Sequence, residues 1–188
     1  MLKKTVNGLL LSMVLLTLST LVVAHSGASG VVKQRMDAMK DMKDSMKTIS
    51  DMFKGKALYE ADKVQAAAAV IRDHAGEQLT KLFPEGSLQH PTEAKPEIWQ
   101  EWDRFSRLAA HLGVLSEGLQ QAAHNTQATQ AAGAMMSDDA MMGHGAMMGE
   151  AMAHTAEEYG NMPVEAVFKK LTDNCSSCHT DFRVEKDK

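Results

Sequence analysis

The sequence Cys175-Ser-Ser-Cys178-His179 brings two thiols and an imidazole together near the carboxyl end of the chain. With two residues between them, the cysteines project to neighbouring points on one side of a helix. This separation suits two thiols that add across the two vinyl groups of a haem, and the adjoining imidazole then lies beneath the ring, where one nitrogen can bind the iron. The sequence therefore predicts one covalent haem c, attached through Cys175 and Cys178, with its iron held by His179.

Three other chemistries use two cysteines at this spacing. A disulfide would close only a small, strained loop on one helix. A thioredoxin-like redox pair belongs in a strand–helix setting, which the sequence does not indicate. A structural zinc site needs further ligands, and no second Cys/His pair at ligand spacing supplies them. The haem interpretation is favoured over all three.

The amino terminus has the pattern of a secretory signal peptide. Two lysines are followed by an apolar stretch over residues 6–23, and Ala24 comes before a polar continuation. This order predicts cleavage near Ala24 and export to the bacterial periplasm, with residues 1–24 as the signal peptide and 25–188 as one mature domain. A retained membrane helix is the alternative, and no later segment is apolar enough to span a bilayer. The formal charge of −4 disfavours nucleic acid as a partner.

Four amphipathic helices are predicted. Apolar residues recur every three or four positions in four stretches, at residues 32–53, 58–82, 98–119 and 164–182. Helix-forming residues dominate, and no stretch alternates apolar and polar residues. Pro84 ends the second helix, Pro96 and Pro163 open the third and fourth, and residues 84–96 form a surface loop. The expected fold is an all-α, antiparallel four-helix bundle with the haem near the C-terminal helix.

Residues from about 134 to 160 interrupt this scheme. They are rich in Gly, Met, Ala, Asp and His, contain a six-residue repeat and lack helical patterning, which predicts an inserted, mobile loop. Thioethers and imidazoles bind copper, so a copper site is a further hypothesis. Its tentative ligands are Met135, Met136, Met141, Met142, His144, Met147 and Met148. An insertion without a ligand and a site of methionine oxidation are the alternatives.

Three segments resemble the class II c-type cytochromes, which include cytochrome c′ and its low-spin relatives. Residues 175–183, read as CSSCHTDFR, resemble the family's CxxCHxxFR signature. Residues 32–40 resemble its first-helix pattern, with Met36 where the family often has Gln, and residues 96–99 resemble the start of its third helix. The likeness covers the mature chain outside the insertion. It implies that Met39 lies opposite His179 on the iron, that Arg35 contacts a haem propionate, and that the protein pairs as a homodimer through its first two helices.

The role of Met39 separates two activities. A thioether bound to iron gives a low-spin His/Met haem, which suits one-electron transfer with redox partner proteins, and this is the activity expected here. If Met39 only packs over the iron, the haem is five-coordinate and high-spin and binds nitric oxide or carbon monoxide, as the resemblance to cytochrome c′ implies. A copper-binding protein is a third alternative. No pairing that spacing can reveal suggests a general acid or base, so an electron carrier rather than an enzyme is expected.

Overall fold

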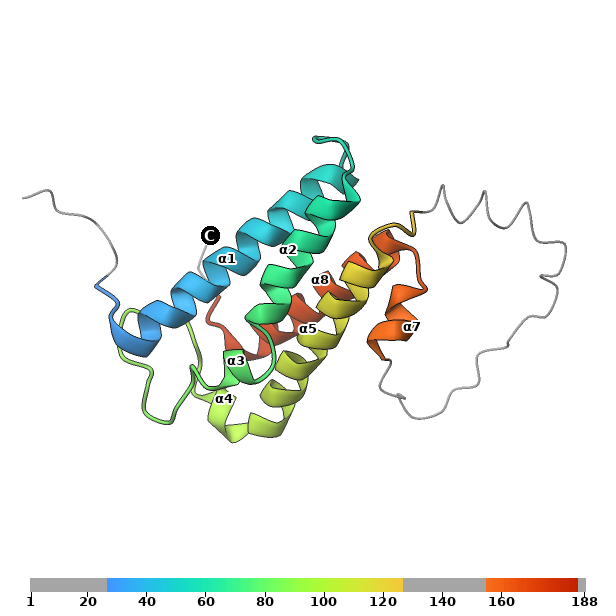
Figure 1. Ribbon diagram of the computed structural model, residues 1–188. Coiled ribbons are helices and arrows are strands. Elements are labelled where there is room, and N and C mark those ends of the chain that lie inside the picture. The colour runs from blue at the N-terminus through green and yellow to red at the C-terminus, as the bar shows by residue number, and fades with distance from the viewer. Residues whose placement is uncertain (1–26, 127–154, 186–188) are drawn as a thin grey trace, which may run out of the picture.

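The computed structural model describes residues 27–126 and 155–185, and within them the chain is helical. The helices are α1 (Gly30–Phe53), α2 (Ala61–Asp73), α3 (Glu77–Thr80), α4 (Glu97–Gln100), α5 (Trp102–Ala122), α7 (Ala156–Gly160) and α8 (Val164–Phe182). The described ranges contain no strand beyond one isolated bridge between Ala94 and Arg183. The four long helices α1, α2, α5 and α8 form the predicted bundle (Figure 1). The predicted signal peptide and most of the predicted insertion lie outside the described residues.

The helices of the bundle do not all pack on each other equally. Close packing runs from α1 to α2, from α2 to α5 and from α5 to α8, whereas α1 and α8 make little direct contact. Ile49, Val64, Leu115, Leu119 and Leu171 are fully buried in the main apolar core that these packed pairs enclose. Among the described helices, none combines the length and apolar character that crossing a bilayer requires.

The apolar stripe of α1 is only partly as predicted. Val32, Met42 and Ile49 are buried, but Met36 is 42% exposed, and the neighbouring Arg35 is buried with 5% of its surface exposed. The spacing predicts that each apolar side chain of this helix faces the core. Because one flank of α1 faces a cavity instead of another helix, an arginine is buried there and a methionine lies at the rim.

The second predicted helix is two helices, and the single helix over residues 58–82 is wrong. The chain leaves α2 after Asp73 and begins α3 at Glu77. Gly76, between them, has a φ of +57°, a conformation that glycine adopts without steric cost. Its N–H donates to the carbonyl of Ala109 on α5 at 2.8 Å, which fixes the break against the bundle.

The third predicted helix is also broken near its start. Glu101, with φ −117° and ψ 41°, separates α4 from α5. Trp99, before the break, is half-buried and donates its indole N–H to the carbonyl of Phe83 at 2.9 Å. Trp102 belongs by its spacing to the apolar stripe of the helix predicted over residues 98–119, but 39% of its surface is exposed, so its expected core position is wrong. The break changes the helical register, so the two tryptophans do not share one buried face.

The loop predicted over residues 134 to about 160 is too long, because its last residues form the helix α7. Thr155 and Glu158 form a capping box, in which each side chain accepts a hydrogen bond from the other residue's backbone N–H. Tyr159 is buried with 3% of its surface exposed. A Cβ atom at Gly118 on α5 would lie 2.3 Å from the Cβ of Tyr159, so the close approach of α7 to α5 requires glycine there.

Tyr59 gives a prediction about stability at high pH. Its hydroxyl donates to the carbonyl of Ala123, and burial, with a smaller contribution from Glu165, raises its pKa to about 12. An unfolded tyrosine ionises near pH 10, so this stabilisation is complete below about pH 10 and is lost as the pH rises towards 12. We expect Tyr59→Phe to cost about 1 kcal/mol at pH 7 and to flatten the decline between pH 10 and 12. Urea unfolding at several pH values measures both effects, and an equally steep decline in the variant would contradict the assignment.

Candidate functional site

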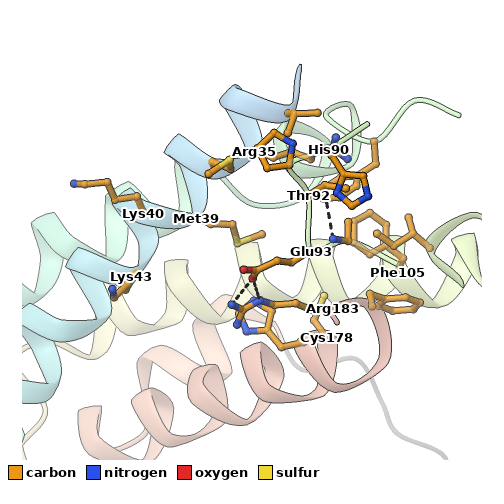
Figure 2. A pocket seen from close by; sticks show the side chains of 18 residues that line it. Arg35, Met39, Lys40, Lys43, His90, Thr92, Glu93, Phe105, Cys178 and Arg183 are labelled. Atoms are coloured by element: carbon orange, nitrogen blue, oxygen red, sulfur yellow. Dashed lines mark hydrogen bonds and ion pairs between the residues drawn. The ribbon is translucent and has the colours of Figure 1, made fainter. Parts of the chain in front are cut away.

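A cavity of about 730 Å³ lies between α1, the loop over residues 84–96 and α8. It occupies the side of the bundle where α1 and α8 make little direct contact. Figure 2 shows Arg35 and Met39 reaching it from α1, Cys178 from α8, and Glu93 from the loop. Its volume falls in the range of sites that hold a cofactor or ligand. The structure therefore brings the candidate residues from opposite ends of the sequence into one site.

The two cysteines lie in the second half of α8, as predicted. Cys178 and His179 line the cavity, and Cys175 lies one turn earlier, half-buried against the main core. Burial raises the pKa of both thiols, that of Cys178 to about 11. A redox-active pair needs a lowered thiol pKa. The raised pKa values therefore disfavour the redox alternative and suit thiols that are consumed once, in covalent attachment.

The surroundings of His179 favour the neutral form of its side chain, which an iron ligand needs. Burial is the main effect that lowers its pKa; the charge of Arg183 lowers it further, and Glu93 acts in the opposite sense. The neutral imidazole is therefore favoured, and only a neutral ring nitrogen can bind a metal ion. His179 is placed on the cavity wall as the predicted role requires.

A chain of hydrogen bonds outside the cavity holds the part of α8 that precedes Cys175. Asn174, directly before Cys175, donates from its amide nitrogen to the carbonyl of Leu108 at 3.1 Å, so its amide oxygen faces His111 Nδ1 at 3.2 Å. Nδ1 then carries the proton, and Nε2 accepts from the hydroxyl of Tyr159 at 3.0 Å. The network joins α5, α7 and α8. Its polar groups lie too far apart in the sequence for spacing to reveal it.

The surroundings of Arg35 indicate whether the cavity suits a haem. Its side chain is 95% buried, lies over the ring of Phe83 at 4.7 Å, and donates one hydrogen bond, from Nη2 to the carbonyl of Ser87. Its Nε and Nη1 atoms are buried without a hydrogen-bond partner. A buried guanidinium with unpaired donors requires an acceptor, for which a carboxylate fits best. A haem carries two propionates, so the residues present fit that cofactor.

Substitution of Arg35 by methionine should destabilise the haem-loaded protein. The variant keeps the apolar stem but leaves a propionate without its donor, at a cost of roughly 2–3 kcal/mol. Arg72→Met is the matched control, because Arg72 is exposed beside Asp73 and such surface pairs contribute little. Urea unfolding of both holoproteins measures the difference. Equal stability of the two variants would mean that no carboxylate reaches Arg35.

Met39 lies on the α1 wall of the cavity. Its partly buried side chain packs against the main core and also against a second apolar cluster that includes Phe105 and Phe182. Cys178 packs against the same second cluster from α8. Met39 and α8 thus meet at this cluster, although at the level of the sequence only the resemblance had placed Met39 in the site.

The loop over residues 84–96 contributes residues that the sequence did not suggest for the site. His90 and Glu93 line the cavity, and Glu93 forms an ion pair with Arg183 of α8. The loop was correctly predicted as irregular, but proline and glycine content carries no information about which side chains turn inward. The one available signal is a histidine and an acidic residue in a loop next to a predicted cofactor site.

The tentative copper ligands lie outside the described residues. Within the parts of the chain that the structure describes, no group of three or more His, Cys, Asp or Glu side chains could hold a metal ion. That finding also leaves the structural zinc alternative without a ligand set in the described ranges.

A four-helix bundle with a cavity beside a CxxCH helix defines the helical-bundle class of c-type cytochromes. The family model for cytochrome c′ matches residues 30–141. The chain belongs to the cytochrome c′ family. The class II assignment and the four-helix fold are thereby confirmed.

Individual relatives agree with the family model. Cytochrome c′ of Rhodopseudomonas palustris is 29% identical over 175 residues, which cover 90% of this chain and 95% of the relative. Cytochrome c-556 of Agrobacterium tumefaciens is 35% identical over 86 residues, or 46% of this chain and 69% of the relative. A solved structure of cytochrome c′ from R. palustris superimposes with a TM-score of 0.60 at 27% identity, over 85% of this chain and all of the other.

Proposed function

We propose that this protein is a periplasmic monohaem cytochrome whose iron binds a small diatomic gas, nitric oxide or carbon monoxide. The haem is attached through Cys175 and Cys178, His179 holds the iron on one side, and Arg35 binds a propionate. When bound, the haem supplies an iron that exchanges one electron and accepts an axial ligand. The protein's own residues hold the cofactor, exclude water and shape the space in which a ligand arrives.

The packing of Met39 is the observation that carries the proposal. Its side chain is engaged by two apolar clusters on the cavity wall, so with a haem bound it would act as a packing group on the side away from His179, where the resemblance places it. An apolar cover over an iron with an open position admits a small uncharged molecule and excludes larger or charged ones. The match to cytochrome c′ of R. palustris, which spans nearly the full length of both chains, supports the same function.

Electron transfer through a six-coordinate haem is the second candidate function. The sequence favours it, and the thioether of Met39 on the cavity wall is the feature that supports it. A low-spin His/Met iron has no open position for a gas, so it would serve outer-sphere electron exchange with a redox partner protein. The relationship to cytochrome c-556 is compatible with either candidate.

Spectra of the purified haem protein test the proposal. We expect a high-spin ferric electron paramagnetic resonance signal and a shift of the reduced optical spectrum when carbon monoxide is added. A low-spin protein whose spectrum does not change with carbon monoxide would establish electron transfer, the second candidate, instead. Absence of covalent haem would overturn both.

We also propose that the protein forms a homodimer through α1 and α2. Leu58, in the turn between these helices, is 86% exposed, and Val70 on α2 is 39% exposed. Burying such side chains at a subunit contact stabilises a dimer by roughly 25 cal/mol per Å² of apolar surface. Sedimentation equilibrium measures the mass in solution, and a monomer at all concentrations would contradict this part of the proposal.

A further inference from the structure

The loop over residues 84–96 is tied to the end of α8 by backbone hydrogen bonds. The N–H of Val184 donates to the carbonyl of Glu93 at 2.7 Å, and the N–H of Lys95 donates to the carbonyl of Phe182 at 2.9 Å. These two bonds lie on either side of the isolated antiparallel bridge. The backbone at Glu93 is therefore fixed relative to the last turn of α8, which begins beside His179.

The side chain of Glu93 is fixed as well. Arg183 donates to Glu93 Oε2 from Nε at 2.8 Å and from Nη2. Figure 2 shows this pair at the cavity, with the ion pair drawn as dashed lines. Glu93 is 38% and Arg183 47% exposed, so the pair by itself contributes little to stability. Its position is the more informative property: both residues line the cavity with His179, and the backbone N–H of Arg183 donates to the carbonyl of His179 at 3.1 Å.

An iron-bound histidine needs an acceptor for its second ring nitrogen. Such a histidine almost always donates that N–H to a carboxylate, a carbonyl or water, and a carboxylate raises the basicity of the ligand. Among the described residues that line the cavity, Glu93 is the one acidic side chain. Asp181, on the same turn of α8, pairs with Arg104 at 2.6 Å.

We propose that Glu93 is a positioning residue for the haem iron: it accepts the second N–H of His179, and Arg183 holds its carboxylate in place. The inference rests on the proposed role of His179 as the iron ligand. A more basic imidazole binds ferric iron more strongly than ferrous iron. Glu93 therefore lowers the reduction potential of the haem and strengthens the bond between the iron and His179.

Substitutions of Glu93 in the haem-loaded protein test this role. Glu93→Gln should shift the equilibrium towards reduced iron by about tenfold, which is about 59 mV for one electron. It should also lower the iron–histidine stretching frequency in the resonance Raman spectrum of the reduced protein. Glu85→Gln is the matched control, because Glu85 belongs to the same loop but does not line the cavity. This control should change neither quantity.

Glu93→Asp separates positioning from simple charge. The shorter side chain keeps the negative charge but withdraws the carboxylate by one methylene, so positioning predicts a potential close to that of Glu93→Gln. A potential equal to that of the unsubstituted protein would show a charge effect alone and overturn the proposal. An unchanged potential in Glu93→Gln, with haem attached, would overturn it while leaving the haem assignment intact. Failure of the unsubstituted protein to carry haem would instead remove the proposed function itself.

Discussion

Replacement of both Cys175 and Cys178 by alanine should abolish covalent haem attachment completely. These are the chain's two cysteines, so no other thiol can form a thioether with the haem vinyl groups. Haem staining of a denaturing gel should be negative, and the mass of the polypeptide should fall by that of the haem. Each single substitution should leave one thioether and a shifted optical spectrum of the pyridine complex.

Ser176→Ala with Ser177→Ala is the control for the double cysteine variant. Both serines are exposed, and each hydroxyl donates at 3.0 Å to a carbonyl four residues earlier on α8. Their removal changes the same turn of helix without touching the cavity, so covalent haem should remain at full occupancy. Haem that withstands denaturation in the double cysteine variant would refute the attachment site.

The haem-attachment helix was predictable because its information is local. Pro163 opens α8, an apolar residue recurs every turn, and the cysteines follow at a fixed spacing. Each of these features lies within one helix of 19 residues and depends on backbone geometry alone. The structure accordingly reproduces the predicted helix.

The breaks at Gly76 and Glu101 were not predictable from periodicity. Ala75 and Leu79 are both buried at helical spacing, yet Ala75 belongs to the main core and Leu79 to the second cluster. The periodic spacing of apolar residues indicates that they share one face of a helix, but it does not indicate which apolar cluster they pack against. The bond from Gly76 to Ala109 joins positions far apart in the chain, and that contact selects the bend.

In the site, too, some residues follow from local sequence and others only from contacts between distant parts of the chain. His179 follows from the motif, whereas Glu93 and Arg183 are 90 residues apart and meet only in the folded chain. Arg35 was expected at a propionate by resemblance, but its burial and its two unpaired donor atoms are structural findings. Sequence spacing predicts the groups that would bind the haem, and the structure adds neighbouring groups that we propose influence them.

Substitution of Met39 by alanine should open the haem face opposite His179. Met39 is partly buried between two apolar clusters, so the smaller side chain leaves a space directly in the path of an incoming gas. We expect carbon monoxide to associate with the reduced protein about tenfold faster or more, which corresponds to a barrier lower by about 1.4 kcal/mol. The lost packing should also reduce the free energy of unfolding by about 2 kcal/mol. Flash photolysis and urea unfolding measure the two effects.

Met46→Ala distinguishes access to the iron from general loosening of α1. Met46 is partly buried against the main core but does not line the cavity, so its removal costs similar packing without opening the haem face. Carbon monoxide kinetics should be unchanged in that variant, even though its stability falls. If the unsubstituted protein is low-spin and only Met39→Ala becomes high-spin and reactive towards carbon monoxide, Met39 is the sixth ligand of the iron. Electron transfer would then replace gas binding as the function, because a thioether that must first leave the iron closes the position that a gas requires.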